Sequence, residues 1–383
     1  MQRRPVHNRG AVIRISTGPR SGTLALVAAL VIVPACQART EGDFDLDGLP
    51  HYEAEQMVSG AIRNFGFGLG GVLAQWEEGF RKLHPEVRFV DHLPTSDAAI
   101  PALVTGVADL APDGGEATLT ETLSFFETYG YHPTDITVAT GAFDVEGRSN
   151  GIVVFVNAAN PLARLTLQQL DGIFGAERSA GMRGFKWTPS DGRGAQDNIR
   201  TWGQLGLKGE WADKPIQTYG HAPSGTTRFF QWKVMKNGDK WNPNYREYVE
   251  SGSKMIADED RAEQRMGLQH MLRDELAHDR YGIAWTVMPQ AQGVSGIKPV
   301  ALAARDGGPY IAASTASFQD RSYPLVRSIY VYLNRAPGRP VDPKLKEFLR
   351  YALSREGQEA VVRSGGYLPL TRQLAREQLA RLE

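Results

Sequence analysis

The spacing of apolar residues changes repeatedly along the chain, and each change predicts a new element. Short runs such as GAIRNFG (60–66) and VRFVD (87–91) have the length and composition of strands. A helix is predicted between them, because apolar side chains recur every three or four positions before Pro85. These side chains are Val72, Leu73, Trp76, Phe80 and Leu83. Strands that alternate with helices in this way predict an α/β fold with mostly parallel strands.

The same alternation continues to the C-terminus. Apolar runs at residues 151–157, 281–288 and 328–334 predict three further strands. One helix is predicted to begin at Thr166, where the sequence forms a capping box, and another at Pro343, where proline suits the first helical position. The pattern therefore predicts a large α/β protein with no internal repeat.

The length of this patterned region predicts two lobes. Roughly 325 residues exceed the size at which a single hydrophobic core is usual. With 42% apolar and 22% charged residues, the composition is that of an ordinary globular protein. We expect residues 59–148 and 300–383 to form the first lobe, and residues 149–299 to form the second.

The first 35 residues have the pattern of an export signal. They contain five arginines and no acidic residue, followed by a ten-residue apolar run from Leu24 to Val33 that is too short to span a bilayer. The run leads into VPAC, which ends at Cys36, the sole cysteine of the chain. This order predicts a signal peptide over residues 1–35 and a lipid on Cys36. Residues 36–58 are polar and acidic, and we interpret them as a flexible tether.

Charge and cysteine content exclude several classes of function. Removing the five leader arginines from the 43 basic residues leaves 38 against 43 acidic residues, a net charge of about −5. A mildly acidic body argues against nucleic acid, and against a membrane contact other than the lipid anchor. A single cysteine leaves no disulfide and no cysteine-based metal site or nucleophile.

The segment GFGLGG, from Gly66 to Gly71, is the first candidate site. It matches the dinucleotide pattern G-x-G-x-x-G after a predicted strand and before a helix, and Asp91 follows 20 residues after Gly71. Glycines at such a turn let backbone amides approach a phosphate. The segment is equally compatible with a free oxyanion, or with a glycine-rich turn that binds nothing.

The segment HAPSGTTRFF, residues 221–230, is the second candidate site. Ser224 is placed to cap a helix whose first turn contains Gly225 and Thr226. Unpaired amides and hydroxyls would then meet at the positive end of the helix dipole, which favours an anion. Arg228 lies in or just after the same turn, where a cation is unfavourable without an anion nearby. The alternative is an ordinary capped helix with an exposed arginine.

A third candidate is a helix face bearing His270, Asp274 and His278 at four-residue spacing. Such a face could hold a metal, but two turns separate the histidines and the pattern suggests no fourth ligand. A solvated helix face explains the same spacing. We therefore predict no metal and no cofactor, and the chain contains no H-E-x-x-H, G-x-S-x-G or Walker motif.

Three longer segments carry a family resemblance. GIVVFVNAANPLARLTLQQLDGIFG, SGTTRFF and the block from YPLVRSIYVYLN to GGYLPL resemble the phosphate-binding proteins of bacterial ABC transporters. The likeness extends from about Ile62 to Leu370. It implies a type 2 periplasmic binding protein, with two α/β lobes and the ligand in the cleft between them. It also implies a non-enzymatic monomer in the periplasm or cell envelope, with inorganic phosphate as ligand and an ABC permease as partner.

The resemblance also implies which residues bind. It assigns backbone donors near Phe67 and Gly68, a hydroxyl at Ser96, an acidic residue at Asp113 or one position later, and the S-G-T element at Ser224, Gly225 and Thr226. A buried carboxylate only accepts hydrogen bonds, so it would select phosphate, which retains a proton, over sulfate.

The sequence departs from the family just before this S-G-T element. Members of the family usually carry an arginine there, whereas this chain has Gly220, His221, Ala222 and Pro223. His221 or Arg228 would have to supply the missing positive charge; if His221 does, affinity should weaken as pH rises through its pKa. Three alternatives stay open: a different oxyanion or a phosphate ester, an exported dinucleotide-dependent oxidoreductase using Gly66, Gly68, Gly71 and Asp91, and a ligand-free scaffold at the cell envelope.

Overall fold

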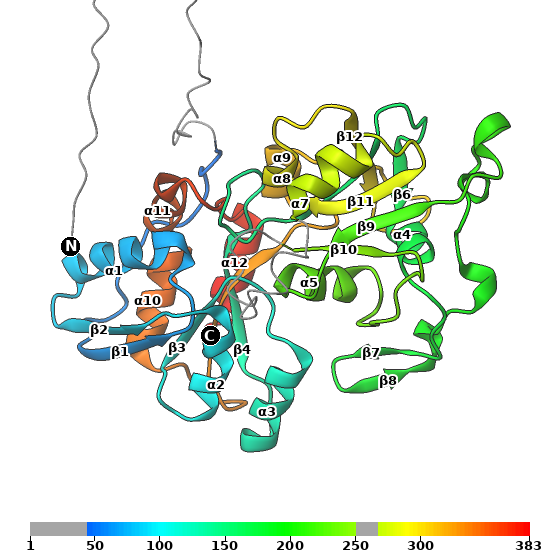
Figure 1. The fold of residues 1–383 in the computed structure, drawn as a ribbon. Coiled ribbons are helices and arrows are strands. Elements are labelled where there is room, and N and C mark those ends of the chain that lie inside the picture. The colour runs from blue at the N-terminus through cyan, green and yellow to red at the C-terminus, as the bar shows by residue number, and fades with distance from the viewer. Residues whose placement is uncertain (1–43, 250–266) are drawn as a thin grey trace, which may run out of the picture. The chain divides into compact units, whose positions relative to one another are not determined.

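The computed structural model describes residues 44–249 and 267–383. The first sheet combines strands from the N-terminal and C-terminal parts of these residues. The strand order is β2-β1-β3-β14-β4 (Figure 1). The strands are β1 (Gly60–Phe65), β2 (Val87–His92), β3 (Leu110–Asp113), β4 (Thr134–Thr140) and β14 (Ser328–Leu333). β1, β2 and β3 are parallel, whereas β14 runs antiparallel to both of its neighbours. The predicted leader and Cys36 lie outside the described residues.

Helices from the two ends of the chain pack on this sheet (Figure 1). They are α1 (Val72–Leu83), α2 (Ala99–Val104), α3 (Leu119–Tyr129), α10 (Pro343–Leu353), α11 (Arg355–Ser364) and α12 (Arg372–Ala380). The apolar stripe of α1 is fully buried at Trp76 and Phe80, and the Trp76 indole donates to the carbonyl of Gly357 at 2.8 Å. Burial of such a stripe supplies most of the stability of a helix of this length.

The second sheet has the order β10-β9-β11-β5-β12. Its strands are β5 (Ile152–Asn157), β9 (Gln217–His221), β10 (Arg246–Tyr248), β11 (Gly282–Val287) and β12 (Ile297–Pro299). Every residue of the neighbouring strands β5 and β11 is buried, which explains why both read as unbroken apolar runs. The helices of this lobe include α4 (Leu167–Phe174), α5 (Gly225–Lys233), α8 (Met288–Ala291) and α9 (Thr315–Gln319). The predicted capping box at Thr166 forms.

The chain crosses between the two sheets twice, and the two crossing segments are hydrogen-bonded to each other. The amide of Gly141 donates to the carbonyl of Arg327 at 2.9 Å, and Ile152 donates to Leu325 at 3.0 Å. The return crossing comes later than residue 300, where the sequence predicted it. Strand β13 (Ala301–Ala303) still pairs with β6 (Arg164–Thr166) rather than with the first sheet.

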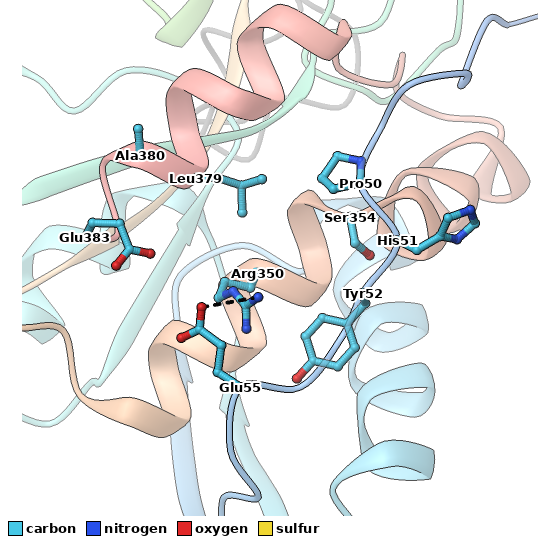
Figure 2. Close-up of a pocket in the computed structure, with 9 residues that line it drawn as sticks. All are labelled: Pro50, His51, Tyr52, Glu55, Arg350, Ser354, Leu379, Ala380 and Glu383. Carbon is cyan, nitrogen blue, oxygen red and sulfur yellow. Dashed lines mark ion pairs between the residues drawn. The ribbon is translucent and has the colours of Figure 1, made fainter.

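Residues 44–58, which we call the strap, lie against the first lobe. Phe44, Leu46 and Leu49 bury their side chains in the core. Polar contacts add to this: Tyr52 donates to Glu347 at 2.6 Å, and Glu55 pairs with Arg350 at 3.4 Å (Figure 2). The prediction of a flexible tether is therefore wrong for residues 44–58, because three apolar side chains among the acidic ones anchor the segment.

The helices of the described ranges are all too short or too polar to cross a membrane.

Candidate functional site

One cavity of about 850 Å³ is lined by elements of both lobes. The lining includes the predicted site residues Phe67, Ser96, Asp113, Ser224, Gly225, Thr226 and Arg228. They come from segments separated by up to 160 positions, so only the fold brings them together. The structure therefore places most of the residues that the sequence singled out around a single hollow.

The first lobe contributes a hydroxyl and a carboxyl group to this cavity. Ser96 opens a 3-10 turn, η3 (Ser96–Ala98), and its Oγ accepts from the amide of Gly114 at 3.0 Å. Asp113 ends β3, and its Oδ1 accepts from the amide of Gly115 at 3.0 Å. A side chain at Gly114 would meet Ser149 Oγ at 2.6 Å, so glycine lets the two segments approach closely.

Asp113 has an unusual electrostatic environment. Its side chain is only 4% exposed. Burial raises its pKa to about 7, and hydrogen bonds from Ser96 and from the Gly115 amide offset this effect only in part. Near neutral pH, the carboxyl group can therefore either accept a proton from a ligand or donate one.

The second lobe contributes the N-terminus of α5. Ser224 is extended and caps the helix, with its Oγ accepting from the amide of Thr227 at 3.2 Å. The hydroxyl of Thr227 is used inside the lobe, where it donates to the carbonyl of Ala222 at 2.6 Å. Ser224, Gly225 and Thr226 line the cavity at the positive end of the helix dipole. This is the geometry that the S-G-T element predicted.

Arg228 links the two sides of the cavity. Its Nη2 lies 3.5 Å from Oδ1 of Asp97, which belongs to η3 in the first lobe. The Arg228 side chain is 50% exposed and that of Asp97 is 69% exposed. Since a carboxylate already faces this arginine, much of its charge is balanced before any anion enters.

Comparison with known proteins shows the family of this chain. A family profile described as a PBP superfamily domain matches residues 68–356. The phosphate-binding protein PstS of Pseudomonas aeruginosa is 31% identical over 360 residues, which cover 93% of this chain and 98% of that protein. The chain belongs to the PBP superfamily.

Two solved structures align over about four fifths of this chain. PstS from Borrelia burgdorferi aligns with a TM-score of 0.50 at 11% identity, over 81% of this chain and 99% of that one. An ABC-type phosphate transport receptor from Vibrio cholerae aligns with a TM-score of 0.46 at 19% identity, over 80% of this chain and 99% of that one. The predicted type 2 fold, with two α/β lobes, is confirmed.

Two of the predicted site residues, His221 and Gly68, do not line the cavity. The His221 side chain is 1% exposed, its ring stacks on Trp285, and its Nε2 lies 2.9 Å from Thr286 Oγ1. Burial lowers the pKa of His221 to about 3, so the ring is neutral at physiological pH and supplies no charge to an anion. Gly68 caps the 3-10 turn η2 (Leu69–Gly71) outside the lining.

The backbone amide predicted to bind at Phe67 already has a partner. It donates to the carbonyl of Pro112 at 2.8 Å, which joins the turn after β1 to β3. Phe67 therefore lines the cavity with its ring or carbonyl rather than with a free amide.

Backbone packing accounts for the glycines that resemble a dinucleotide fingerprint. A side chain at Gly66 would collide with the carbonyl of Pro112, and its φ of 146° suits glycine. Gly71 caps α1 with a φ of 96°. Asp91 accepts from Asn64 at 3.0 Å and lies beside Glu77, whose pKa burial raises to about 8. Neither Gly66, Gly71 nor Asp91 lines the cavity.

The histidine-rich helix face forms no metal cluster among the described residues. His270 Nδ1 pairs with Asp274 at 2.9 Å, and a π-helical turn, η8 (Met271–Leu276), follows directly. This wider π-helical turn lies between His270 and His278. Because of it, His278 does not follow the regular helical spacing that would place it on the same face.

Sequence reasoning missed two arginines that line the cavity, Arg148 and Arg327. Each lies near a crossing segment, far along the chain from the S-G-T element. The only local signal was the position of Arg327 immediately before a predicted strand, and that signal does not indicate a ligand.

Proposed function

We propose that this chain is a non-enzymatic, extracytoplasmic binding protein for inorganic phosphate. The observation that carries the proposal is the placement of Asp113 and the N-terminus of α5 on the same cavity. Hydroxyls of Ser96, Ser224 and Thr226 and the free amides of α5 are donors, whereas the Asp113 carboxylate is an acceptor. Few anions other than a protonated oxyanion satisfy both kinds of group.

The physical chemistry favours phosphate over sulfate. A dianion that leaves water needs many donors, which neutral hydroxyls and helix amides provide without a large opposing charge. The remaining proton of phosphate can be donated to Asp113. Sulfate has no proton near neutral pH, so it would leave the buried carboxylate unpaired.

The relatives support a role in transport. The name of the Pseudomonas protein states that it binds phosphate, and that of the Vibrio structure refers to an ABC-type phosphate transport receptor. We infer that this chain delivers phosphate to an ABC permease as a monomer in the periplasm or cell envelope. The order of leader arginines, apolar run and Cys36 supports a lipid anchor on that cysteine.

The proposal is tested by titration calorimetry of the full chain, refolded from denaturant to remove carried ligand. Wild type should bind phosphate and give no heat with sulfate or NADH at pH 8. Ser224→Gly and Thr226→Val each remove one hydroxyl, and each should weaken phosphate binding by about tenfold. Glycine is chosen at residue 224 because it caps a helix nearly as well as serine.

The matched control is Ser314→Gly. Ser314 caps α9 in the same manner, with its Oγ accepting from Ser317 at 3.1 Å, but it lies outside the cavity. This variant should bind phosphate like wild type. Wild-type affinity in both Ser224→Gly and Thr226→Val would overturn the site, and NADH binding alone would favour the dinucleotide alternative.

A further inference from the structure

Among the four residues before the S-G-T element, where the family usually carries an arginine, Gly220 has no room for a larger side chain. A Cβ atom at Gly220 would collide with the indole nitrogen of Trp285. Trp285 is held there by stacking between the rings of Phe230 and His221, at centroid distances of 4.5 and 4.8 Å. Rings fill the space that a side chain from residue 220 would need, so this position cannot supply the positive charge.

Arg327 reaches the cavity from the return crossing between the sheets. Its carbonyl is fixed by the amide of Gly141, and its guanidinium carbon lies 5.2 Å from the centre of the Phe229 ring. Gly115 provides the necessary space, because a Cβ atom there would collide with Nη2 of Arg327. Phe229 belongs to α5 and Gly115 follows Asp113, so the guanidinium lies beside the elements that carry both halves of the site.

The charge of Arg327 is poorly compensated. No carboxylate of residues 44–249 or 267–383 forms an ion pair with it within 4 Å, and its Nε is buried with no hydrogen-bond partner. A guanidinium has five N–H donors, and a buried donor left unpaired, as Nε is here, costs free energy. An oxyanion can accept two of these donors side by side.

The other arginines of the lining are better paired. Arg228 faces Asp97 at 3.5 Å. Arg148 donates to the carbonyls of Gly147 and Gly70 at 3.3 and 3.4 Å, although its Nε is also unpaired. Among the described residues, Arg327 is therefore the arginine of the lining that neither pairs with a carboxylate nor donates a hydrogen bond from its side chain.

We propose that Arg327 is the cationic ligand of the bound oxyanion, in place of the arginine missing before Ser224. This inference rests on the proposed phosphate binding. The guanidinium lowers the pKa of Asp113, so the two groups act on each other electrostatically across the cavity. In this proposal, Arg327 donates to oxygens of the dianion, and Asp113 accepts a hydrogen bond from its remaining proton.

The test is phosphate titration of the full chain carrying Arg327→Gln or Arg327→Lys at pH 8. Arg327→Gln should weaken phosphate binding by about 30-fold or more, since it removes the proposed charge partner of the ligand. Arg327→Lys keeps the charge but loses the planar fork, so its affinity should lie between those of Arg327→Gln and wild type.

A matched control separates this role from a general effect of removing an arginine. Arg164 also lies over an aromatic ring, 4.8 Å from the centre of Tyr310, but outside the cavity. Arg164→Gln should bind phosphate like wild type. Without phosphate, Arg327→Gln should melt at or above the wild-type temperature, because it removes an unpaired charge. Phosphate should then raise its melting temperature far less than that of wild type.

The outcomes distinguish this inference from the proposed function. If wild type and Arg327→Gln bind phosphate equally, Arg327 is not a ligand and the proposed function stands. If wild type binds no phosphate, the proposed function fails and the role of Arg327 with it. If Arg327→Gln does not fold, a wild-type affinity in Arg327→Lys overturns the bidentate contact, and an intermediate affinity supports it.

Discussion

Two cavities of this protein are lined by similar charged side chains but differ in how the charges are paired. Beneath the strap, a cavity of about 280 Å³ is bordered by Glu55, Arg350 and Glu383 (Figure 2). Arg350 pairs with Glu55 and with Glu347, and Lys346 pairs with Glu55 and Glu383. Between the lobes, by contrast, Arg327 has no ion pair with a described residue and Asp113 is buried with a raised pKa.

This difference separates a structural contact from a binding site. A closed set of ion pairs holds two chain segments together and has little left to offer a ligand. When buried groups have unused donors and acceptors, binding a complementary ligand is favourable because it pairs them. Pairing is therefore a better guide to function here than the presence of charge.

The largest effect should come from removing Glu347, which pairs with Arg350 and Tyr52 of the cavity beneath the strap. This carboxylate is 0% exposed and accepts from Tyr52, from the Glu55 amide and from Arg350. Glu347→Ala should lower the free energy of unfolding by about 3–5 kcal/mol, because it removes a buried carboxylate that accepts from three donors and leaves Arg350 with Glu55 as its ion-pair partner. Urea denaturation followed by fluorescence measures this change.

The control is Glu359→Ala, which removes a more exposed carboxylate that pairs with Arg355 at 3.1 Å on α11. Its cost should be below about 1 kcal/mol. If the two variants lose similar stability, the strap network is not a special structural contact and the comparison of the two cavities fails.

A second effect concerns the pH dependence of anion selection by Asp113. With a pKa raised to about 7, this group is ionised above pH 7 and neutral below it. Only the neutral form can donate a hydrogen bond to sulfate. Sulfate affinity should therefore fall about tenfold for each pH unit above 7 and level off below it. Calorimetry at pH 5.5, 7 and 8.5 measures the trend.

Asp113→Asn provides the matched variant for this experiment. Its amide donates at every pH, so it should bind sulfate at pH 8.5 and show a flat pH profile. A wild-type sulfate affinity that does not change with pH would mean that Asp113 does not control selection.

The smallest effect should come from Arg228. Because Asp97 already faces it across the cavity, Arg228→Gln should change phosphate affinity by less than about threefold, well below the effect of Arg327→Gln. Phosphate titration of the two variants side by side measures the difference. A larger loss in Arg228→Gln than in Arg327→Gln would reverse the assignment of the main cation.

Much of the fold was predictable because its signals are local. The buried strands at 152–157 and 282–287 were found as unbroken apolar runs, and the helices at Thr166 and Pro343 were found from their first residues. The strap was missed because three separated apolar residues in an acidic stretch have no helical or strand period. They are buried in a core cluster that also contains residues of α10 and α11, about 300 positions away.

The candidate site was predictable only in part, for the same reason. Ser224, Gly225 and Thr226 form a local motif whose helix N-terminus is visible in the sequence. His221 appeared to be a candidate cation because it lies in the stretch before Ser224 where the family usually carries an arginine. In space, its ring stacks on Trp285, and burial keeps it neutral.

The sequence alone thus determined the α/β class, the main strands and helices, and the helix start at Ser224. Each of these depends on the spacing of residues that lie close together in the sequence. The tertiary structure decided which of these elements share a cavity, which charges are paired, and which arginines line that cavity. Those properties depend on distances between residues far apart in the chain, such as Asp113 and Arg327. Electrostatic energies change steeply with distance and burial, so no local pattern can specify them.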